Sequence, residues 1–338
     1  INEGSHKIDL IAANTDLQVL HISKAPKKIQ LGLKLTKGLG AGMKPEVGRD
    51  SAVESYEEIK ATLKGADIIF IAAGLGGGTG TGAAAIIAKA AKEIGALTVS
   101  VVTKPFTWEG KKRAGLANLG LEELKKVSDS IIIVPNDRLL EIIDENVGMK
   151  DAFKIIDNIL YQAVNGMSEV ILNPGNSDIN TDFADVKTIM QHKGMALMGI
   201  GRAKGENAAQ RALEDAIDSP LLDKVSLNGA KGILIHFNIH PQVSLFAIND
   251  VMGTINDRMD SNAEIIFGTT SDSTLEKDEV KITIVATGFE SKNDEVEETS
   301  EANEENTNQS SAALDDSNEN YYDTPPFMRD YRVQYQLN

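Results

Sequence analysis

Four short apolar runs in the first half of the chain alternate with longer stretches of helical periodicity. The runs are rich in Ile and Val, carry few charges, and cover residues 7–13, 67–73, 96–103 and 130–135. Such runs are typical of parallel strands that are buried on both faces. The helical patterns cover residues 49–64, 80–94, 110–127 and 137–146. This order predicts an open α/β sheet that binds ligands at the carboxyl ends of its strands.

A long amphipathic stretch, residues 149–172, follows this first α/β region. Its apolar residues recur at three- and four-residue steps, as in one helix face: Phe153, Ile156, Leu160, Val164, Met167 and Ile171. Further strand patterns cover residues 196–201, 232–237, 265–269 and 280–286, with helical patterns near 206–218 and 243–258. We therefore expect a central helix that leads into a second, smaller α/β domain, which ends near residue 289.

Charge is distributed unevenly and sets the end of the chain apart. Of the formal net charge of -16, residues 290–320 carry -10, because 11 acidic residues face the single base Lys292. Such a segment buries too little apolar surface to offset its chain entropy and is typical of a disordered linker. Residues 321–338 change character, with four of the six Tyr and the run Pro325-Pro326-Phe327-Met328. This peptide predicts a docking motif for a partner, or a tail that packs on its own chain.

Composition excludes several classes of protein. The acidic balance argues against a nucleic-acid-binding protein, which needs a cationic face. The chain has no Cys, so disulfides and thiolate metal sites are excluded, and its five His lack ligand spacing, so no metal site is predicted. No apolar stretch is long enough to cross a membrane and no signal peptide is visible, which favours a cytoplasmic protein without membrane insertion.

The densest motif is a glycine-rich loop between a predicted strand and a predicted helix. Residues 74–82 read Gly-Leu-Gly-Gly-Gly-Thr-Gly-Thr-Gly. Backbone N–H groups at a helix N-terminus can bind phosphates, so phosphate binding is predicted; a purely structural turn is the alternative. The loop lacks the Gly spacing of a dinucleotide-binding motif and the Gly-Lys-Ser/Thr of a P-loop.

This loop resembles the signature loop of the tubulin/FtsZ superfamily, and its surroundings resemble the FtsZ family of bacterial division proteins. Six further motifs match in order, at residues 14–16, 38–42, 103–106, 109–113, 135–138 and 180–185. The resemblance covers roughly residues 1–289 and returns at residues 323–332, which look like the family's partner-binding peptide. It implies a tubulin/FtsZ-like α/β fold with a parallel sheet, a long central helix and a smaller domain with a mixed sheet.

The resemblance implies a GTP site. The residues carried over to the phosphates are Gly76, Gly77, Gly78, Thr79, Gly80, Ala41 and Gly42. Glu109 and Arg113 match ribose and phosphate contacts, whereas spacing alone also allows a surface ion pair between them. Asn136 and Asp157 match the guanine contacts, and a carboxylate can accept from N1–H and the amino group of guanine. Phe153 could stack on the base or lie in the core. Mg²⁺ is implied with the nucleotide.

Hydrolysis is implied for Asn180, Asp182 and Asp185. If a helix begins here, the two carboxylates lie at its first turn and can polarise a water molecule for attack on the γ-phosphate. Without the resemblance, N-capping by Asn180 and first-turn acids would be the simpler interpretation. In FtsZ-like proteins this loop enters the site of the next subunit, which couples hydrolysis to head-to-tail assembly.

The chain also departs from the family pattern. The loop before Asp182 looks slightly longer than usual. Family members begin with a strand and a glycine-rich loop before the position of Ile1, together with an Asn that contacts guanine. We therefore expect a chain that lacks this segment and binds GTP weakly by itself.

The resulting prediction is a GTP-hydrolysing cytoskeletal protein that polymerises into the mid-cell division ring. Its partners are further copies of itself and, through residues 323–332, a membrane-tethering division protein such as an FtsA-like protein. The predicted domains are residues 1–148 (GTP binding), 149–173 (central helix), 174–289 (C-terminal activation domain), 290–320 (linker) and 321–338 (partner peptide). Two alternatives are a nucleotide-binding relative that does not hydrolyse GTP and an ordinary α/β enzyme acting on a small molecule.

Overall fold

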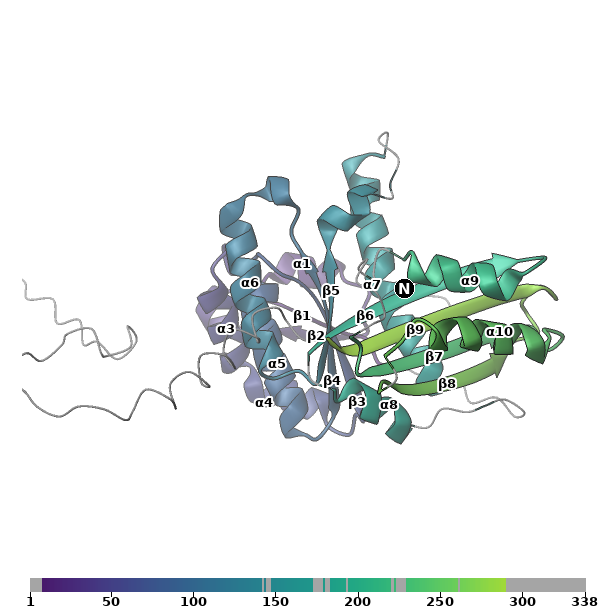
Figure 1. Cartoon of the computed structure of the whole chain (residues 1–338). Helices are drawn as coiled ribbons and strands as arrows, with labels where there is room; N and C mark the ends of the chain where they lie inside the picture. Colours follow the sequence, from purple (N-terminus) through teal and green to yellow (C-terminus); the bar gives the residue numbers. More distant parts are fainter. Residues whose placement is uncertain are drawn as a thin grey trace, which may run out of the picture. The chain divides into compact units, whose positions relative to one another are not determined.

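The computed structural model describes residues 8–141, 143, 147–172, 179, 183–192, 194–219, 222, 229–260 and 262–289. The predicted linker and partner peptide, residues 290–338, lie outside this range, as do Asn180 and Asp182. The described residues form an α/β fold around one large sheet (Figure 1).

A seven-stranded sheet has the order β3-β4-β5-β6-β9-β7-β8. Its strands are β3 (Ile68–Gly74), β4 (Leu97–Lys104), β5 (Ser130–Pro135), β6 (Met195–Lys204), β7 (Gly232–Ile239), β8 (Glu264–Ser271) and β9 (Glu279–Phe289). Strands β3 to β6 run parallel, and β9 lies antiparallel between β6 and β7. The mixed character of the second half confirms the predicted fold class.

The two halves of the sheet join where β5 pairs with β6. The pairing is short, with Ile131 opposite Met195 and Ile132 opposite Ala196. Because these residues lie at the start of both strands, the first residues of β6 lie beside the amino end of β5. The register therefore fixes which loops share an edge of the sheet.

Helices cover both faces of the β3-β4-β5 half. On one side lie α3 (Pro45–Glu54), α4 (Tyr56–Leu63), α5 (Thr79–Glu93) and α6 (Lys111–Lys125), and on the other α7 (Met149–Leu172), as Figure 1 shows. The faces of β4 alternate: Val99 and Val101 pack with α7, and Val102 packs with the α5 side. Burial on both faces explains why these strands read as continuous apolar runs.

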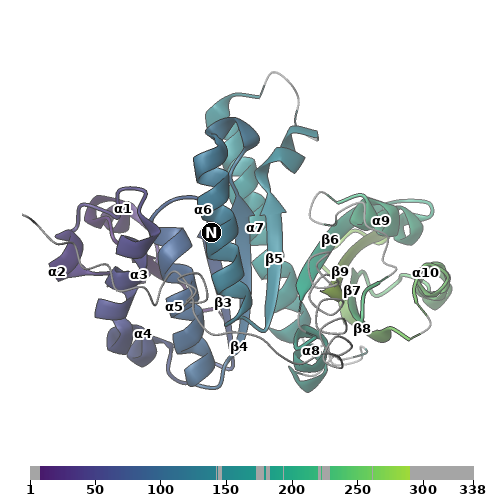
Figure 2. The same ribbon diagram turned by 60° about the vertical axis from the view of Figure 1, so that its left-hand side comes forward.

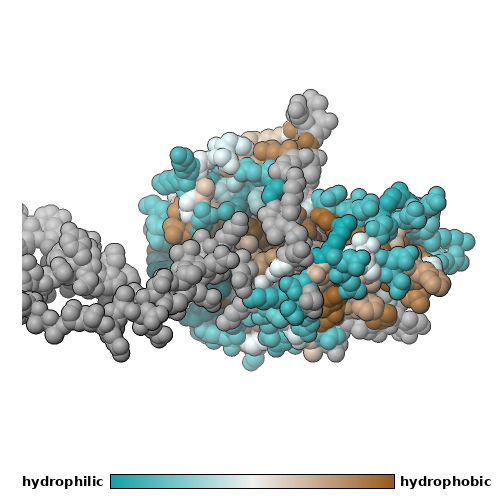
Figure 3. Space-filling view, viewed as in Figure 1, coloured by the Kyte–Doolittle hydropathy of each residue, from teal (hydrophilic) through white to brown (hydrophobic). Residues whose placement is uncertain are grey.

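The β6-β9-β7-β8 half carries α9 (Ala208–Ile217) and α10 (Leu245–Asn256) over a core that includes Phe237 and Leu213. The short helix α8 (Phe183–Met190) packs against β7 and β8. Figure 3 shows apolar residues gathered among hydrophilic ones over the area that α10 and β8 occupy in Figure 1. Leu245 and Phe246, in the first turn of α10, are among the exposed apolar residues.

Three predictions about local structure need correction. The run at residues 7–13 yields β1 (Ile11–Asn14), which pairs with β2 (Lys27–Gln30) in a separate two-stranded sheet. The single helix predicted for residues 49–64 is divided at Ser55 into α3 and α4. The helix predicted for residues 137–146 is a 3-10 helix, η2 (Asn136–Glu141).

The described part of the chain offers neither a membrane-spanning helix nor a cluster of metal ligands. None of its helices is both long and apolar enough to cross a membrane. In the same residues, no three His or acidic side chains gather as metal ligands would.

Candidate functional site

The glycine-rich loop leaves the carboxyl end of β3 and enters α5, as its sequence predicts. Leu75 N–H donates to Thr103 O (2.9 Å), and Gly76 N–H donates to Thr81 Oγ1 (2.8 Å). In the part of the chain that the structure describes, Gly77 and Gly78 donate to no other backbone group. The first N–H groups of α5 also lack intrahelical acceptors, because they open the helix. The loop therefore presents several free N–H donors and the positive end of a helix dipole.

Contacts on both sides explain the density of glycine. Gly76 has φ +97°, and a Cβ there would lie 2.9 Å from Arg113 Cγ. A Cβ on Gly78 would lie 2.7 Å from the Cβ of Ala41. Around Gly77, in contrast, a Cβ would meet no atom within 4 Å. The loop is thus held on two sides and open at its centre, where a phosphate group has room.

Ala41 and Gly42 lie beside this loop. Ala41 is buried, and its carbonyl accepts from Lys44 N–H (3.0 Å) in a tight turn. Thr79 is bonded to Thr15, which follows β1, with 2.5 Å between the two hydroxyl oxygens. The segments that follow β1 and β2 thus reach the phosphate loop, and the structure brings together the predicted phosphate residues.

Glu109 and Arg113 lie on the opposite side of the loop, near Gly76. Glu109 ends η1 (Thr107–Glu109), and its carboxylate accepts from Phe106 N–H (2.8 Å) and pairs with Arg113 Nη1 (2.7 Å). The structure therefore shows the ion pair that their spacing allows. Arg113 Nε is buried without a partner among the described residues, which leaves one donor available to a ligand.

An aromatic cluster stands beside this pair. Phe106 is buried; Trp108 stacks on it with ring centroids 5.3 Å apart, and Phe153 meets it edge-on at 6.1 Å. The Phe153 side chain is 41% exposed, so one face remains free for a planar ligand. Asp157 lies one helical turn further along α7 and is also exposed.

Asn136 and Asp137 follow β5. Asn136 is 6% exposed, and its Oδ1 is buried without a partner among the described residues. Asp137 accepts from Thr107 N–H (2.9 Å) and Thr107 Oγ1 (2.5 Å), which ties η1 to the start of η2. The sequence did not single out Asp137, because its partner is thirty residues away and only the alignment of β4 with β5 brings them together.

All these groups share one edge of the sheet, since β3, β4 and β5 are parallel and their carboxyl ends meet. The edge offers free N–H donors, an arginine, an exposed aromatic face and an unpaired amide oxygen. A phosphorylated purine nucleoside needs this set: donors for phosphates, a flat surface for the base and polar groups for its edge. The residues therefore fit a nucleoside triphosphate.

The helix α8, which carries Asp185, lies at the other edge. Asn180 and Asp182 are outside the described residues, but Asp185 is in the first turn of α8. Ile179, just before, exchanges hydrogen bonds with Thr269 of β8 (2.8 and 2.9 Å). Since α8 leads into the start of β6, it lies at the amino ends of the parallel strands (Figure 2). The structure therefore does not bring Asp185 to the phosphate loop of its own chain.

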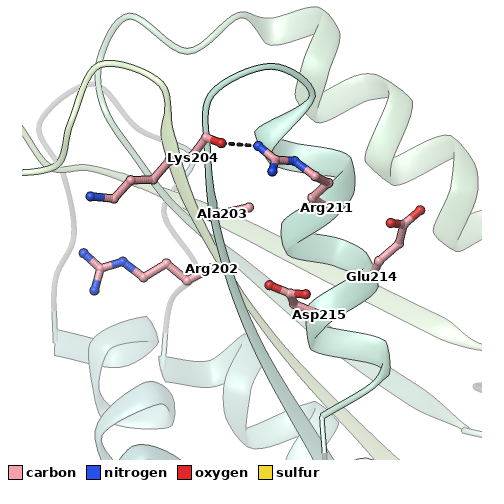
Figure 4. Close-up of a pocket in the computed structure, with 6 residues that line it drawn as sticks. All are labelled: Arg202, Ala203, Lys204, Arg211, Glu214 and Asp215. Carbon is pink, nitrogen blue, oxygen red and sulfur yellow. Dashed lines mark hydrogen bonds between the residues drawn. The ribbon is translucent and has the colours of Figure 1, made fainter.

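A separate cavity of about 560 Å³ lies between β6 and α9 and is lined by Arg202, Ala203, Lys204, Arg211, Glu214 and Asp215 (Figure 4). Its cations are already engaged: Arg202 with Glu279, Lys204 with Glu276, and Arg211 with the carbonyl of Lys204. The hydrogen bond from Arg202 lowers the pKa of the buried Glu279 carboxyl below its usual value. The charged side chains that line this cavity therefore form a surface network of their own, distinct from the phosphate loop.

Two histidines outside the phosphate loop, His192 and His236, contact polar side chains. His192 lies 3.3 Å from a carboxylate oxygen of Glu264, and His236 lies 2.9 Å from Thr270 Oγ1. Neither lies at the carboxyl edge of β3 to β5.

Two family models match the chain: "Tubulin/FtsZ family, GTPase domain" at residues 2–144 and "FtsZ family, C-terminal domain" at residues 194–290. Among solved structures, an empty FtsZ dimer from M. jannaschii is 48% identical with a TM-score of 0.76, over 82% of this chain and 80% of that chain. CetZ2 from Haloferax volcanii, in a GTPγS-bound protofilament, is 20% identical with a TM-score of 0.69, over 88% of this chain and 90% of that chain. The last likeness shows the fold alone.

Proposed function

The chain belongs to the FtsZ family of tubulin-like cytoskeletal GTPases, and from that premise we propose that it binds and hydrolyses GTP and polymerises head to tail into the filaments of a division ring. The geometry at the carboxyl edge of the sheet supports GTP binding. The position of α8 supports hydrolysis that is coupled to head-to-tail assembly.

The phosphates bind the free N–H groups of residues 77–80, and Ala41 and Gly42 lie against the terminal phosphate from the other side. Arg113 reaches the same space because it packs on Gly76. Mg²⁺ bound together with the nucleotide would neutralise negative charge at the terminal phosphate. Each charge-assisted N–H bond contributes about 1.5–3 kcal/mol, so the loop accounts for most of the affinity.

Selection of guanine falls to Asn136 and Asp157, with Phe153 against the base. The unpaired Oδ1 of Asn136 needs a donor, and the Asp157 carboxylate accepts from the N1–H and amino group of guanine, where adenine offers no such pair of donors. Glu109, already oriented by Phe106 N–H and Arg113, accepts from a ribose hydroxyl.

Hydrolysis takes place between two copies. The observation that carries this proposal is the placement of α8 and the phosphate loop at opposite edges of parallel strands. Asp185, with Asp182 and Asn180, polarises a water molecule at the γ-phosphate of the adjacent copy. A contact of one edge with the opposite edge of the next copy does not close, so it propagates as a filament.

The test is the GTPase rate per molecule as a function of protein concentration. A site completed by a second copy gives almost no turnover below a critical concentration. Above it the total rate rises linearly with protein concentration, so the rate per molecule rises toward a plateau. A constant rate per molecule at all concentrations contradicts the shared site, and assembly without phosphate release identifies a relative that does not hydrolyse GTP.

For the tail, we propose that residues 323–332 bind a membrane-tethering division protein of the FtsA kind and so bring the filament to mid-cell in the cytoplasm. Its Pro-fixed apolar run supports this role. Deletion of residues 321–338 should leave GTP binding and assembly intact but abolish co-sedimentation with the tether. Unchanged co-sedimentation would contradict the assignment.

A further inference from the structure

One surface of the molecule combines exposed lysines with exposed aliphatic side chains. It is formed by α1 (Leu17–Ile22), α2 (Leu33–Thr36) and the loop after α2, which lie together at one end of the described body (Figure 2). Its apolar members are Leu17, Val19, Ile22, Leu33, Leu35 and Leu39. Two of them are almost fully solvated, with Ile22 81% and Leu39 84% exposed. We call this the basic apolar surface.

Its charge is opposite to that of the chain as a whole. Residues 17–45 contain six lysines and no Asp or Glu, in a protein with a net charge of -16. All six lysines are exposed. Within the described residues, one of the six lysines forms an ion pair, Lys27 with Asp9. The ammonium groups of Lys24, Lys34 and Lys37 have no carboxylate partner there. Lysines without a carboxylate partner in so short a segment repel one another, so a bound anion would stabilise them.

Hydrogen bonds make these elements one continuous surface. Leu17 N–H donates to Gly38 O (3.0 Å), and Lys28 Nζ donates to His21 O (3.0 Å). Glu54, from α3, accepts from the N–H groups of Lys34 and Leu35 and so fixes the start of α2 from behind. The lysines and aliphatic side chains are therefore presented on a fixed backbone.

The chain itself contains a segment of the complementary chemistry. Residues 290–320 carry a net charge of -10, and Tyr321, Tyr322, Phe327 and Tyr331 follow them. Acidic residues followed by large apolar ones match lysines interspersed with exposed Leu and Ile. We propose that the basic apolar surface binds the acidic segment, residues 290–331, of a second copy of this chain.

Two features favour this occupant over an anionic membrane. The apolar side chains are distributed over a six-residue helix, a four-residue helix and a loop, whereas membrane-surface binding is typical of one long amphipathic helix. The remainder of the chain is strongly acidic and would be repelled by anionic lipids. The choice of a second copy rests on the proposed function, since head-to-tail assembly brings many acidic segments close to each surface.

Such an interaction would link neighbouring filaments or neighbouring subunits through their tails. It would also compete with any tether for residues 323–331, so that a tail held by a neighbouring core is not free for the membrane. Because the attraction is mainly electrostatic, it should weaken as ionic strength rises.

The experiment uses a fluorescent synthetic peptide of residues 290–331 and the full chain without nucleotide, below its assembly concentration. Anisotropy should report saturable binding that weakens at least about fivefold between low salt and ~0.15 M salt. The variant K24E/K34E should bind about tenfold more weakly or worse. The control K64E/K89E, with the same charge change directly after α4 and on α5, should stay within about twofold. Unchanged thermal unfolding of both variants shows that they fold.

Equal affinity of the two double variants overturns the proposal, as does absence of peptide binding to the wild-type chain. In a parallel arm, anionic phosphatidylglycerol vesicles are sedimented with the same proteins. If K24E/K34E loses vesicle binding while its peptide binding is unchanged, the surface binds lipid and the proposal is overturned. The peptide assay needs no GTP turnover, so a failure of the proposed GTPase mechanism leaves its result interpretable.

Discussion

Two inactive variants should restore activity when they are mixed, if hydrolysis takes place between copies. The first is Gly77→Asp, which fills the open centre of the phosphate loop. A Cβ there would meet no atom within 4 Å, so we expect the fold to tolerate the substitution. The second is Asp185→Asn, which keeps the size of the side chain in α8 but removes its carboxylate.

The structure sets the magnitudes. A carboxylate about 4 Å from the phosphates costs about 4 kcal/mol at an effective dielectric constant of 20, roughly a thousandfold in GTP affinity. Asp185 is separated from its own phosphate loop by at least the six residues of β5, or about 20 Å at ~3.3 Å per residue. At the same dielectric constant its charge there is worth about 0.8 kcal/mol before screening, and ~20 Å is more than two Debye lengths, which lowers this to about 0.1 kcal/mol. Asp185→Asn should therefore bind GTP within about 1.5-fold of wild type. Loss of water activation should lower its turnover by about 10²–10⁴.

Each variant alone should therefore release almost no phosphate. In an equal mixture, about one quarter of the junctions pair an open pocket with an intact acidic loop, because each partner is drawn independently. We expect about one quarter of the wild-type rate, measured as phosphate release at a fixed total concentration, with co-sedimentation to show that both variants enter the polymer. Gly115→Asp, on an open position of α6, controls for the added charge. A mixture in which both variants co-sediment but that remains as inactive as its components would refute the shared site.

Three further predictions concern single side chains. Asp137→Ala removes both acceptors of Thr107 and should weaken GTP binding about threefold to tenfold, by roughly 1 kcal/mol, in a nucleotide titration, with Asp137→Asn intermediate. Burial, together with the nearby Glu93 carboxylate, raises the pKa of Tyr56 from 10.0 to about 12. The stability that this group contributes is therefore present below pH 10 and lost as pH rises toward 12. Urea unfolding across that range should show a decline that is absent in Tyr56→Phe. The pKa of Glu279 is lowered by Arg202, so the stability that this carboxylate contributes is present above the usual carboxyl pKa and lost as pH falls. Glu279→Gln should therefore be less stable than wild type at neutral pH. A difference in unfolding free energy that stays constant down to acid pH would contradict this account.

Local sequence was sufficient for the elements whose burial is uniform. β5 was predicted with its observed bounds, and so was α7, because a strand buried on both faces and a long amphipathic helix leave unambiguous patterns. The strand β2 was missed, since Lys27 and Lys28 interrupt its apolar pattern and only Ile29 is buried. The division of residues 49–64 at Ser55 was missed because both flanking helices continue the same amphipathic pattern.

The phosphate site at the glycine-rich loop could be predicted from a local motif alone. A run of glycines between a buried strand and a helix defines a place for phosphates, because backbone N–H groups and the helix dipole act locally. The family resemblance rests on the same short motifs. Glu109 and Arg113 were foreseen in two ways, as ligand contacts and as an ion pair, and the structure shows the pair without excluding the contacts.

Which of these local motifs meet depends on the packing of the whole sheet. The alignment of β4 with β5 joins Thr107 to Asp137, and the parallel run of β3 to β5 places Gly76, Arg113 and Asn136 at one edge. The same alignment places Asp185 at the opposite edge, which no spacing along the chain reveals. Local sequence fixes short-range geometry through backbone preferences, whereas contacts between distant segments depend on strand order and direction, which are properties of the whole sheet.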